Sequence, residues 1–262
     1  MKVLVKLGGT LLDAPESRAR LAAELAAAAR AGIELAVVHG GGKQMTQFLA
    51  ERGIDSRFVN GLRVTTPETI DAVLKVFAGS VNHELVSALV AAGARAVGLS
   101  GIDACLAEAE PLDPALGAVG RVVRVNPGLL TLLAANGYVP VVACVAGDRQ
   151  GRIYNVNADQ MAVACAAAFG AEILPFLTDV QGVLGAGREV IPEITAAECE
   201  KLIAQGIATG GMQAKLNAAT DAVRRGVSQV RIAPGGAAGI IQQVLAGQSV
   251  GTRLVLEASP YV

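Results

Sequence analysis

Short apolar runs alternate with longer alanine-rich segments along the chain. The run from Val3 to Val5 is rich in β-branched residues and predicts a buried strand, which Gly8 and Gly9 follow closely. The segment from Ser17 to Ala31 is rich in Ala, Leu and Arg and predicts a helix that stops at Gly32. Further strands are predicted at 34–38, 94–99, 138–144, 173–177 and 229–232, and 251–256 is a candidate edge strand.

Helical patterns fill the segments between these strands. Thr66, Pro67 and Glu68 form a helix start, with a Thr cap, a proline at the first helical position and an acid in the first turn. The region 104–125 is compatible with a hairpin, because Gly117 and Gly120 punctuate short alternating runs. Helices are predicted at 43–52, 66–78, 81–92, 127–136, 160–169, 196–205 and 215–225.

This order of elements predicts an α/β fold, a three-layer α/β/α sandwich with a central, mostly parallel sheet. No linker or low-complexity stretch divides the chain, so we expect a single domain over 1–262, with two functional halves of about 1–160 and 161–262. Ligands of such sheets bind outside the carboxyl ends of the strands. The segments expected at that edge are Lys6–Gly9, His39–Gly42, Ser100–Asp103, Asn155–Asp159, Thr178–Gly182 and Pro234–Gly236.

Composition narrows the class of partner. Aromatic residues make up 3% of the 262 residues and tryptophan is absent, which disfavours a nucleic-acid surface built on stacking. The formal net charge is −1, so no global positive field favours nucleic acid or an anionic membrane. We therefore expect small-molecule substrates, with neither a nucleic acid nor a membrane as partner, and any anion site must be local.

The cysteines indicate the compartment. The four cysteines form no C-x-x-C pair and the chain has only two histidines, so neither a zinc site nor a disulfide scaffold is predicted. Free thiols in a reducing cytoplasm fit better. A strand and a glycine turn come directly after Met1, where a signal peptide would have its apolar core. The most apolar region, 161–177, is interrupted by Gly170, Glu172 and Pro175, and we interpret it as a buried helix followed by a buried strand.

Several familiar motifs are missing. The chain has no G-x-x-x-x-G-K-[ST] loop and no G-x-G-x-x-G after a strand, which argues against a P-loop enzyme and a standard dinucleotide-binding fold. His39 and the three glycines after it resemble an esterase oxyanion motif. No G-x-S-x-G elbow accompanies them, so we interpret His39 as a strand-end histidine that is hydrogen-bonded locally.

Glycine turns and two lysines remain as candidates for chemistry. Lys6 stands at the end of the first strand, and Lys215 starts a predicted helix. Two lysines facing each other over a transferring phosphoryl group would neutralise its oxygens, and bare backbone amides would do the same. A carboxylate such as Asp159 between them would hold both ammonium groups in register. The alternatives are a surface lysine at 215 and an ordinary helix N-cap at 159.

Six motifs in this order make the chain resemble the amino acid kinase family, and within it the branch that phosphorylates N-acetyl-L-glutamate in arginine biosynthesis. The similarity extends over essentially the whole chain, down to Gly251-Thr252-x-Leu254. The motifs are Lys6-x-Gly8-Gly9, His39-Gly40-Gly41-Gly42, Asn60-Gly61-Leu62-Arg63-Val64-Thr65, Asn155-Val156-Asn157-Ala158-Asp159, Thr178-Asp179-Val180-x-Gly182-Val183 and Gly210-Gly211-Met212-x-x-Lys215.

The resemblance implies transfer of the ATP γ-phosphate to the side-chain carboxylate of N-acetyl-L-glutamate. It assigns the first half to the acyl acceptor and the second to ATP, with Mg²⁺ carried on the ATP phosphates rather than held by a protein metal site. It implies Lys6 and Lys215 as the transition-state lysines and Asp159 as their organiser. The implied acceptor-binding residues are Gly41, Gly42, Arg63 and Asn155, and the implied nucleotide-binding residues are Gly8, Gly9, Thr178, Asp179, Gly210, Gly211 and Met212.

The chemistry agrees with that implication. A carboxylate nucleophile with a pKa of about 4 is already ionised at neutral pH, so no general base is needed and the scarcity of histidine is no obstacle. The difficulty is to bring one anion up to another, which calls for lysines, amides and a metal. A guanidinium such as that of Arg63 offers the bidentate geometry that a carboxylate prefers.

The chain departs from the family pattern at three places. Ile102 and Ala104 stand where members often carry Lys and Gly in Ser-Gly-Lys-Asp-Gly, and Lys43 stands where proline is common. Hexameric, arginine-inhibited members carry an additional N-terminal helix, whereas this chain starts at its first strand. We therefore expect an unregulated homodimer that associates through the helices of 66–92.

Other functions remain open at this point. A sister kinase would act on an aminoadipate derivative, glutamate, aspartate, carbamate or UMP, although the segment 60–65 favours the acetylglutamate branch. A non-catalytic nucleotide or metabolite sensor is a different class, and the joint presence of Lys6, Asp159 and Lys215 speaks against it. In a third alternative, the turn at His39 would belong to a hydrolase.

Overall fold

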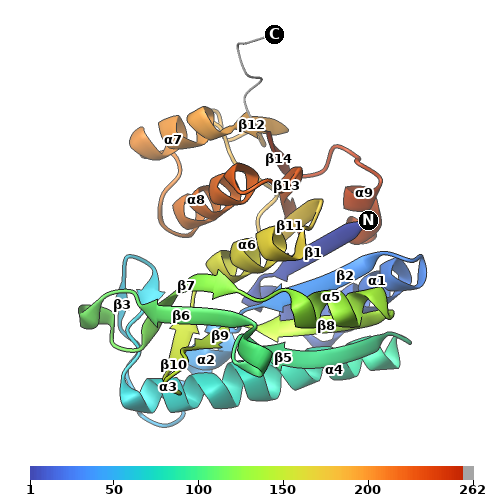
Figure 1. Ribbon diagram of the computed structural model, residues 1–262. Helices are drawn as coiled ribbons and strands as arrows, with labels where there is room; N and C mark the ends of the chain where they lie inside the picture. Colours follow the sequence, from blue (N-terminus) through green and yellow to red (C-terminus); the bar gives the residue numbers. More distant parts are fainter. Residues whose placement is uncertain (256–262) are drawn as a thin grey trace.

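The computed structural model describes residues 1–255, and its centre is an eight-stranded sheet in the order β12-β14-β13-β11-β1-β2-β8-β5 (Figure 1). Neighbouring strands run parallel, except that β13 and β14 are antiparallel. The strands are β1 (Lys2–Leu7), β2 (Glu34–His39), β5 (Arg95–Ser100), β8 (Tyr138–Ala143), β11 (Ile173–Thr178), β12 (Glu193–Thr195), β13 (Gln229–Pro234) and β14 (Thr252–Val255).

Helices cover both faces of this sheet, so the predicted three-layer sandwich is confirmed (Figure 1). The central strands are buried along nearly their whole length, as expected for parallel strands between two helical layers. The α-helices are α1 (Pro15–Arg30), α2 (Gly42–Ala50), α3 (Pro67–Val73), α4 (Asn82–Ala91), α5 (Gly128–Ala135), α6 (Ala158–Phe169), α7 (Ala196–Ala204), α8 (Gly210–Arg224) and α9 (Ile240–Leu245).

A small closed barrel adjoins the sheet. It contains β6 (Ala107–Pro111), β7 (Val119–Val125), β9 (Val145–Gly147) and β10 (Ile153–Val156). Strands β6 and β7 pair antiparallel, which confirms the hairpin in region 104–125. Segment 155–159 therefore starts on the barrel strand β10, not on a strand of the main sheet. A further two-stranded hairpin, β3 (Phe58–Val59) and β4 (Leu62–Arg63), projects from the same half.

Three predicted boundaries are wrong. The two helices expected at 66–78 and 81–92 form one continuous stretch, because a π-helical segment, Leu74–Val81, joins α3 to α4 where Gly79 and Ser80 suggested a break. Strand β14 is not an edge strand, since β12 lies outside it. Helix α8 begins at Gly210, so Lys215 lies in its second turn, not at its start. Residue 256 of the predicted final strand lies outside the described residues.

The continuous stretch Pro67–Ala91 is long and apolar enough to cross a bilayer by length and composition alone. It packs against β5, α1 and α2, and its inward side chains, such as Leu85 and Leu89, are fully buried in the core. Core helices meet the same length and composition test, so this helix is no sign of a membrane span. Thr66 caps it as predicted, with its hydroxyl accepting from the N–H of Thr69 at 3.2 Å.

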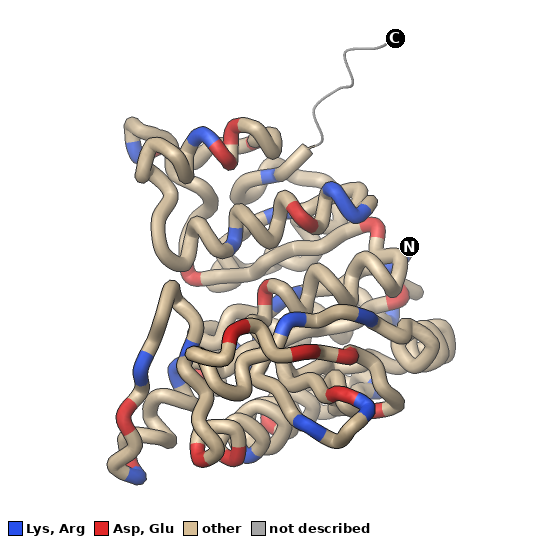
Figure 2. Tube along the Cα trace, turned by 60° about the vertical axis from the view of Figure 1, so that its left-hand side comes forward, with Lys and Arg blue, Asp and Glu red and all other residues tan. Residues whose placement is uncertain are grey.

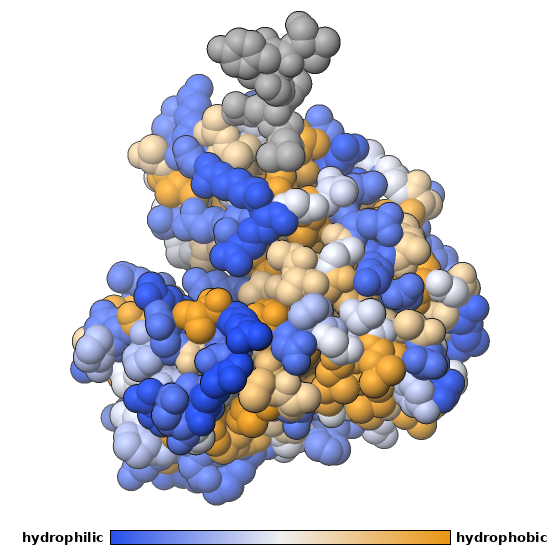
Figure 3. Space-filling model, viewed as in Figure 1, coloured by the Kyte–Doolittle hydropathy of each residue, from blue (hydrophilic) through white to orange (hydrophobic). Residues whose placement is uncertain are grey.

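The two halves of the chain contribute two blocks to one sheet. Strands β1, β2, β8 and β5 come from the first half, and β11, β13, β14 and β12 from the second. In Figure 1 the second block, with α7 and α8, lies above the first. Figure 3 shows a notch in the outline between the region of α7 and α8 and the region of β3 and β4.

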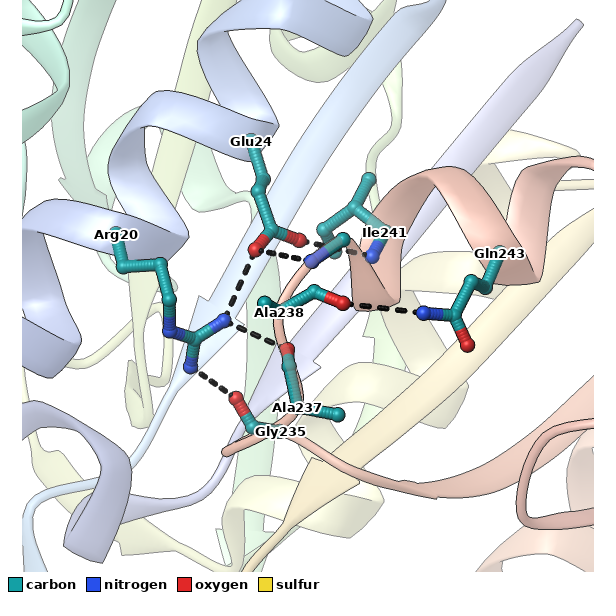
Figure 4. A network of polar contacts seen from close by, with 8 residues as sticks. Arg20, Glu24, Gly235, Ala237, Ala238, Ile241 and Gln243 are labelled. Carbon is teal, nitrogen blue, oxygen red and sulfur yellow. Dashed lines mark hydrogen bonds and ion pairs between the residues drawn. The ribbon is translucent and has the colours of Figure 1, made fainter.

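A partly buried polar contact joins the two halves of the chain. Glu24 of α1 accepts hydrogen bonds from the backbone N–H of Gly239, at 2.9 Å, and of Ile241, at 3.0 Å. Arg20 pairs with Glu24 at 2.9 Å and donates to the carbonyl oxygens of Gly235 and Ala237 (Figure 4). The loop after β13 is thereby held by the first helix of the chain.

Candidate active site

Lys6, Asp159 and Lys215 meet in the structure. Lys6 Nζ lies 2.6 Å from Oδ1 of Asp159, and Lys215 Nζ lies 3.5 Å from Oδ2 of the same carboxylate. The side chains of Lys6 and Asp159 are 7% and 8% exposed, and that of Lys215 is 19% exposed. Lys6 is the last residue but one of β1, Lys215 belongs to α8, and the carboxylate bridges them as the sequence predicted.

The capping of α6 explains why this carboxylate is available. The side chain of Asn157, not that of Asp159, caps the helix, accepting from the N–H of Asp159 at 2.9 Å and of Gln160 at 3.2 Å. Asp159 stands in the first turn, where the helix dipole favours a negative charge. Its carboxylate is therefore left to the two lysines.

Burial alone would raise the pKa of Asp159, because a charged carboxylate loses its hydration. The charges and hydrogen bonds of Lys6 and Lys215 outweigh that effect and hold its pKa below the ordinary value. The cluster is thus two cations on one anion, with a net positive charge at neutral pH. Such a site is suited to an anionic ligand with a growing negative charge.

A cavity of about 160 Å³ lies on the first-half side of this cluster. It brings together all four predicted acceptor-binding residues, Gly41, Gly42, Arg63 and Asn155. Asn155 donates to the hydroxyl of Thr65 at 3.0 Å, which fixes its amide at the wall. Leu62, Val156, Asn157 and Ala158 also line this wall; they stand in the quoted motifs, but no role was predicted for them. The wall residues that no motif includes are Phe58, Phe77, Val119 and Cys144.

Arg63 is held by several bonds within the fold. Its Nη2 donates to the carbonyl oxygen of Gly42 at 3.0 Å and to the hydroxyl of Thr46 at 2.7 Å, and its Nη1 donates to Ser56. Both protons of Nη2 are therefore in use, so the bidentate pairing with a carboxylate requires Nη2 to give up one of these acceptors. Burial lowers the pKa of Arg63 from its ordinary value.

The two glycines after β1 differ in what they offer. The N–H of Gly8 donates to the carbonyl oxygen of Leu177 at 2.9 Å, so it is not a bare backbone amide. Gly9 lies against the turn after β2: a Cβ on it would be 3.2 Å from the nitrogen of Gly42 and 3.4 Å from that of Gly41. Any side chain at position 9 would cover these two amides.

A second cavity, of about 420 Å³, lies in the second half. Asp179 and Met212, two of the predicted nucleotide-binding residues, line it. Thr178 is buried behind it, where its hydroxyl donates to Asp179 Oδ1 at 3.1 Å. Gly210 and Gly211 form the first turn of α8 beside the lining residue Thr209. Val180 and Gly182 of the same motif as Asp179 line it as well, and the lining residues that no motif specified are Gln181, Leu184, Ile207, Ala208 and Thr209.

Similarity to known proteins agrees with this arrangement. The model of the amino acid kinase family matches residues 1–234. The chain is 69% identical over 255 residues to an acetylglutamate kinase of Solibacter usitatus, covering 97% of this chain and 99% of that one. It is 45% identical over 250 residues to an acetylglutamate kinase of Rubrobacter xylanophilus, covering 95% of each chain.

A solved structure has the same architecture. The N-acetylglutamate synthase of Neisseria gonorrhoeae, complexed with coenzyme A and N-acetyl-glutamate, matches with a TM-score of 0.88 at 24% identity. The match covers 98% of this chain and 60% of that chain, and at this identity it shows a shared fold. The matched family model and the two relatives cover nearly all of this sequence. The chain belongs to the amino acid kinase family.

Proposed function

We propose that this chain phosphorylates the side-chain carboxylate of N-acetyl-L-glutamate with ATP, giving N-acetyl-L-glutamyl 5-phosphate for arginine biosynthesis. The Lys6–Asp159–Lys215 cluster is the observation that carries the chemistry. Ala158, next to Asp159, lines the first cavity, and Met212, in the same helix as Lys215, lines the second. The similarity to an acetylglutamate kinase, at 69% identity over nearly the full length, supports N-acetyl-L-glutamate as the acceptor.

The lysines are proposed as the transition-state groups. The acceptor carboxylate is ionised at neutral pH, so the site has no proton to remove. It must instead lower the repulsion between the carboxylate and the transferring phosphoryl group. Lys6 and Lys215 would neutralise charge on that group from two sides, while Asp159 keeps both ammonium groups at a fixed separation.

The first cavity is proposed as the acceptor site. Gly41 and Gly42 would donate through their backbone N–H groups, neither of which donates to another group within residues 1–255. Arg63 would pair with the α-carboxylate, and Asn155 would bind the acetamido end. The apolar side chains of the wall, among them Leu62 and Val119, would surround the uncharged part of the acceptor.

The second cavity is proposed as the nucleotide site. Its lining has several apolar side chains, which suits a base and a ribose, and Asp179 offers acceptor oxygens. Gly210 and Gly211 at the start of α8 would direct backbone N–H groups at the phosphates, as helix N-termini do. The N–H of Met212 donates to the carbonyl oxygen of Thr209 at 3.1 Å, so Met212 would contribute to the lining of the cavity instead. Gly9 would line the path between the nucleotide and the acceptor, with Gly8 and Thr178 supporting the two sides.

Mg²⁺ is proposed to enter with ATP. Within residues 1–255 no three His, Cys, Asp or Glu side chains gather as a metal site, and the one carboxylate at the centre is paired with two lysines. The donor set therefore fits a metal held mainly by phosphate oxygens. When bound, the metal would withdraw charge from the phosphates and add to the effect of the lysines.

We further propose a homodimer in the cytoplasm, associated through the helices of 66–92. Val90 on this stretch is 55% exposed although its neighbours Leu85 and Leu89 are buried.

Lysines, arginines and acids alternate over the trace in Figure 2 without a block of one sign, which suits small-molecule substrates rather than nucleic acid.

The test is an acyl-phosphate assay with a panel of acceptors. Purified protein is incubated with ATP, Mg²⁺ and hydroxylamine, which traps an acyl phosphate as its hydroxamate. We expect product with N-acetyl-L-glutamate and little with N-acetyl-aminoadipate, glutamate or aspartate. A preference for another acceptor would indicate a sister kinase. Tight ATP binding without turnover on any acid would indicate a sensor.

A further inference from the structure

His39 makes contacts that the proposed chemistry does not use. It ends β2, is fully buried, and each ring nitrogen has a polar partner. Nδ1 lies 2.8 Å from the carbonyl oxygen of Gly40, and Nε2 lies 2.9 Å from the side-chain Nδ2 of Asn82, a residue of α4. The prediction of a locally hydrogen-bonded histidine is confirmed, and the second partner comes from another element.

The contacts of Asn82 determine which ring nitrogen carries the proton. Its Nδ2 also lies 2.9 Å from the carbonyl oxygen of Val141, which can only accept. The group facing that carbonyl must therefore be the NH₂ of the amide. Its second proton is directed at His39 Nε2, 2.9 Å away, rather than at the carbonyl oxygen of Leu99, which lies farther away at 3.5 Å. Nε2 must then be the unprotonated nitrogen, so the proton of the neutral ring lies on Nδ1 and is donated to the Gly40 oxygen.

This bond fixes the orientation of one peptide group. The peptide between Gly40 and Gly41 is trans, so its C=O and its N–H point in opposite directions. The carbonyl is drawn toward the buried imidazole, and the N–H of Gly41 therefore points away from it, on the side of the cavity and of Gly9. Without a donor at this place, a peptide flanked by two glycines is free to rotate.

Position 41 has no room for a side chain. A Cβ on Gly41 would lie 2.9 Å from Cδ1 of Phe77 and 3.2 Å from Cγ2 of Val81. The turn thus lies between the π-helical segment on one side and Gly9, in the turn after β1, on the other. A rotated peptide would direct the carbonyl oxygen of Gly40 into a site built for anions.

We propose that His39 is a positioning residue, which acts through the Gly40 carbonyl to aim the N–H of Gly41 at the transferring phosphoryl group or the acceptor carboxylate. Asn82 is the second member of this relay, because it sets the tautomer of the ring. The inference rests on the proposed kinase function. It assigns a role to a polar pair outside the groups that touch substrate.

The burial of the ring supports a permanent relay rather than a switch. Burial lowers the pKa of His39 to about 4, against the smaller opposite effect of its bond to Gly40. The ring therefore keeps one proton throughout the neutral range, and Asn82 holds that proton on Nδ1.

Two substitutions test the two ring nitrogens of His39 separately. His39→Asn places an amide NH₂ near the position of Nδ1 and can still donate to Gly40. His39→Gln places its amide near the position of Nε2, where it can meet Asn82, and leaves Gly40 without a donor. Both remove the ring, so both create a comparable packing defect, and urea unfolding checks that each variant is folded under assay conditions.

If His39 positions the Gly41 amide, His39→Gln lowers kcat for hydroxamate formation by about tenfold to 100-fold, because the site then loses an aligned amide donor. KM for ATP stays within about threefold of the wild-type value. His39→Asn recovers most of that loss. Equal kcat in the two folded variants would overturn the proposal, because the ring would then act only by packing.

A second measurement does not depend on turnover. The ¹⁵N shifts of His39 in labelled protein report its tautomer, and we expect protonated Nδ1 and unprotonated Nε2 at pH 7. Protonation of Nε2 instead would refute the relay even in an active enzyme. Absence of hydroxamate in the wild-type protein, with the expected tautomer present, would refute the proposed reaction rather than the relay.

Discussion

Lys6 and Asp159 form an ion pair of 2.6 Å inside the fold, and each side chain is less than one-tenth exposed. We expect Lys6→Ala to lower kcat by about 100-fold or more while KM for either substrate changes little, because its charge is needed most in the transition state. Steady-state kinetics with ATP and N-acetyl-L-glutamate test this. A rise in KM alone would make Lys6 a binding residue.

The same pair predicts an order of stabilities. Asp159→Asn leaves two lysines facing each other without their anion, which we expect to destabilise the fold by about 3 kcal/mol or more. Lys6→Ala should cost less, because Asp159 keeps Lys215. The control is Lys75→Ala, which breaks the exposed pair with Asp71 and should change the free energy of unfolding by less than about 1 kcal/mol. Urea unfolding gives all three values.

Arg63 should not be replaceable by lysine. Its guanidinium holds Gly42, Thr46 and Ser56 together at the wall of the acceptor cavity, and a lysine cannot reproduce that planar set of donors. We expect Arg63→Lys to raise KM for the acceptor by about tenfold or more, with KM for ATP nearly unchanged. Equal effects on both substrates would place the role of Arg63 outside acceptor binding.

Ala104 predicts a stabilising substitution. It adopts φ +51° and ψ +30°, a left-handed conformation that costs a residue with a Cβ roughly 1 kcal/mol. A glycine adopts this conformation without that cost. Ala104→Gly should raise the free energy of unfolding by about 0.5 kcal/mol after the entropy of glycine is counted. The contrasting control, Ala23→Gly on the exposed side of α1, should lower it by about 1 kcal/mol.

The contact between α1 and the loop before α9 is also testable. Glu24→Gln replaces one of two acceptor oxygens by a donor, which then faces either Arg20 or a backbone N–H. We expect a loss of about 1 to 3 kcal/mol and faster amide hydrogen exchange confined to residues 235–245. Unchanged exchange there would show that the loop is held by packing alone.

The burial of His39 predicts a pH dependence. Between about pH 6.5 and pH 4 the unfolded chain binds a proton at this histidine that the folded chain does not, so folding stability falls as the pH falls through that window. The full loss is about 3 kcal/mol, from the lowered pKa. The depressed carboxyl pKa values of Asp159 and Asp148 act at lower pH. The stability difference between the wild type and His39→Asn should therefore shift by about this amount between pH 7 and pH 4.

Local patterns predicted the parts of the structure that depend on local chemistry. Residues near one another in the sequence predicted the strand before Gly8, the Thr66 cap and the alternation of elements. The order of the motifs predicted that Lys6, Asp159 and Lys215 act together, and the structure places them in contact. The predictions that were wrong depend on contacts between residues that are distant in the sequence. The amide of Gly8 is taken by Leu177, and β14 is covered by β12, which is only three residues long.

The wall of the acceptor cavity could not be predicted in full for the same reason. Its wall includes side chains from β4, β7, β10 and the π-helical segment, whose proximity no spacing in the sequence reveals. The bonds of Arg63 were missed for that reason, since Thr46 and Ser56 carry no motif. Contacts of this kind arise only when the barrel, the hairpin and the sheet come together.

The π-helical segment Leu74–Val81 gives the cavity a way to change in evolution. Each turn of a π-helix holds one residue more than an α-helical turn, so the loss of a single codon from this segment can be absorbed by return to ordinary helix. Residues on one side of the deletion would then turn by about 100° relative to the other side. Phe77 could thereby be withdrawn from the acceptor wall while the helix stays continuous, which would alter acceptor size without changing a residue that handles charge.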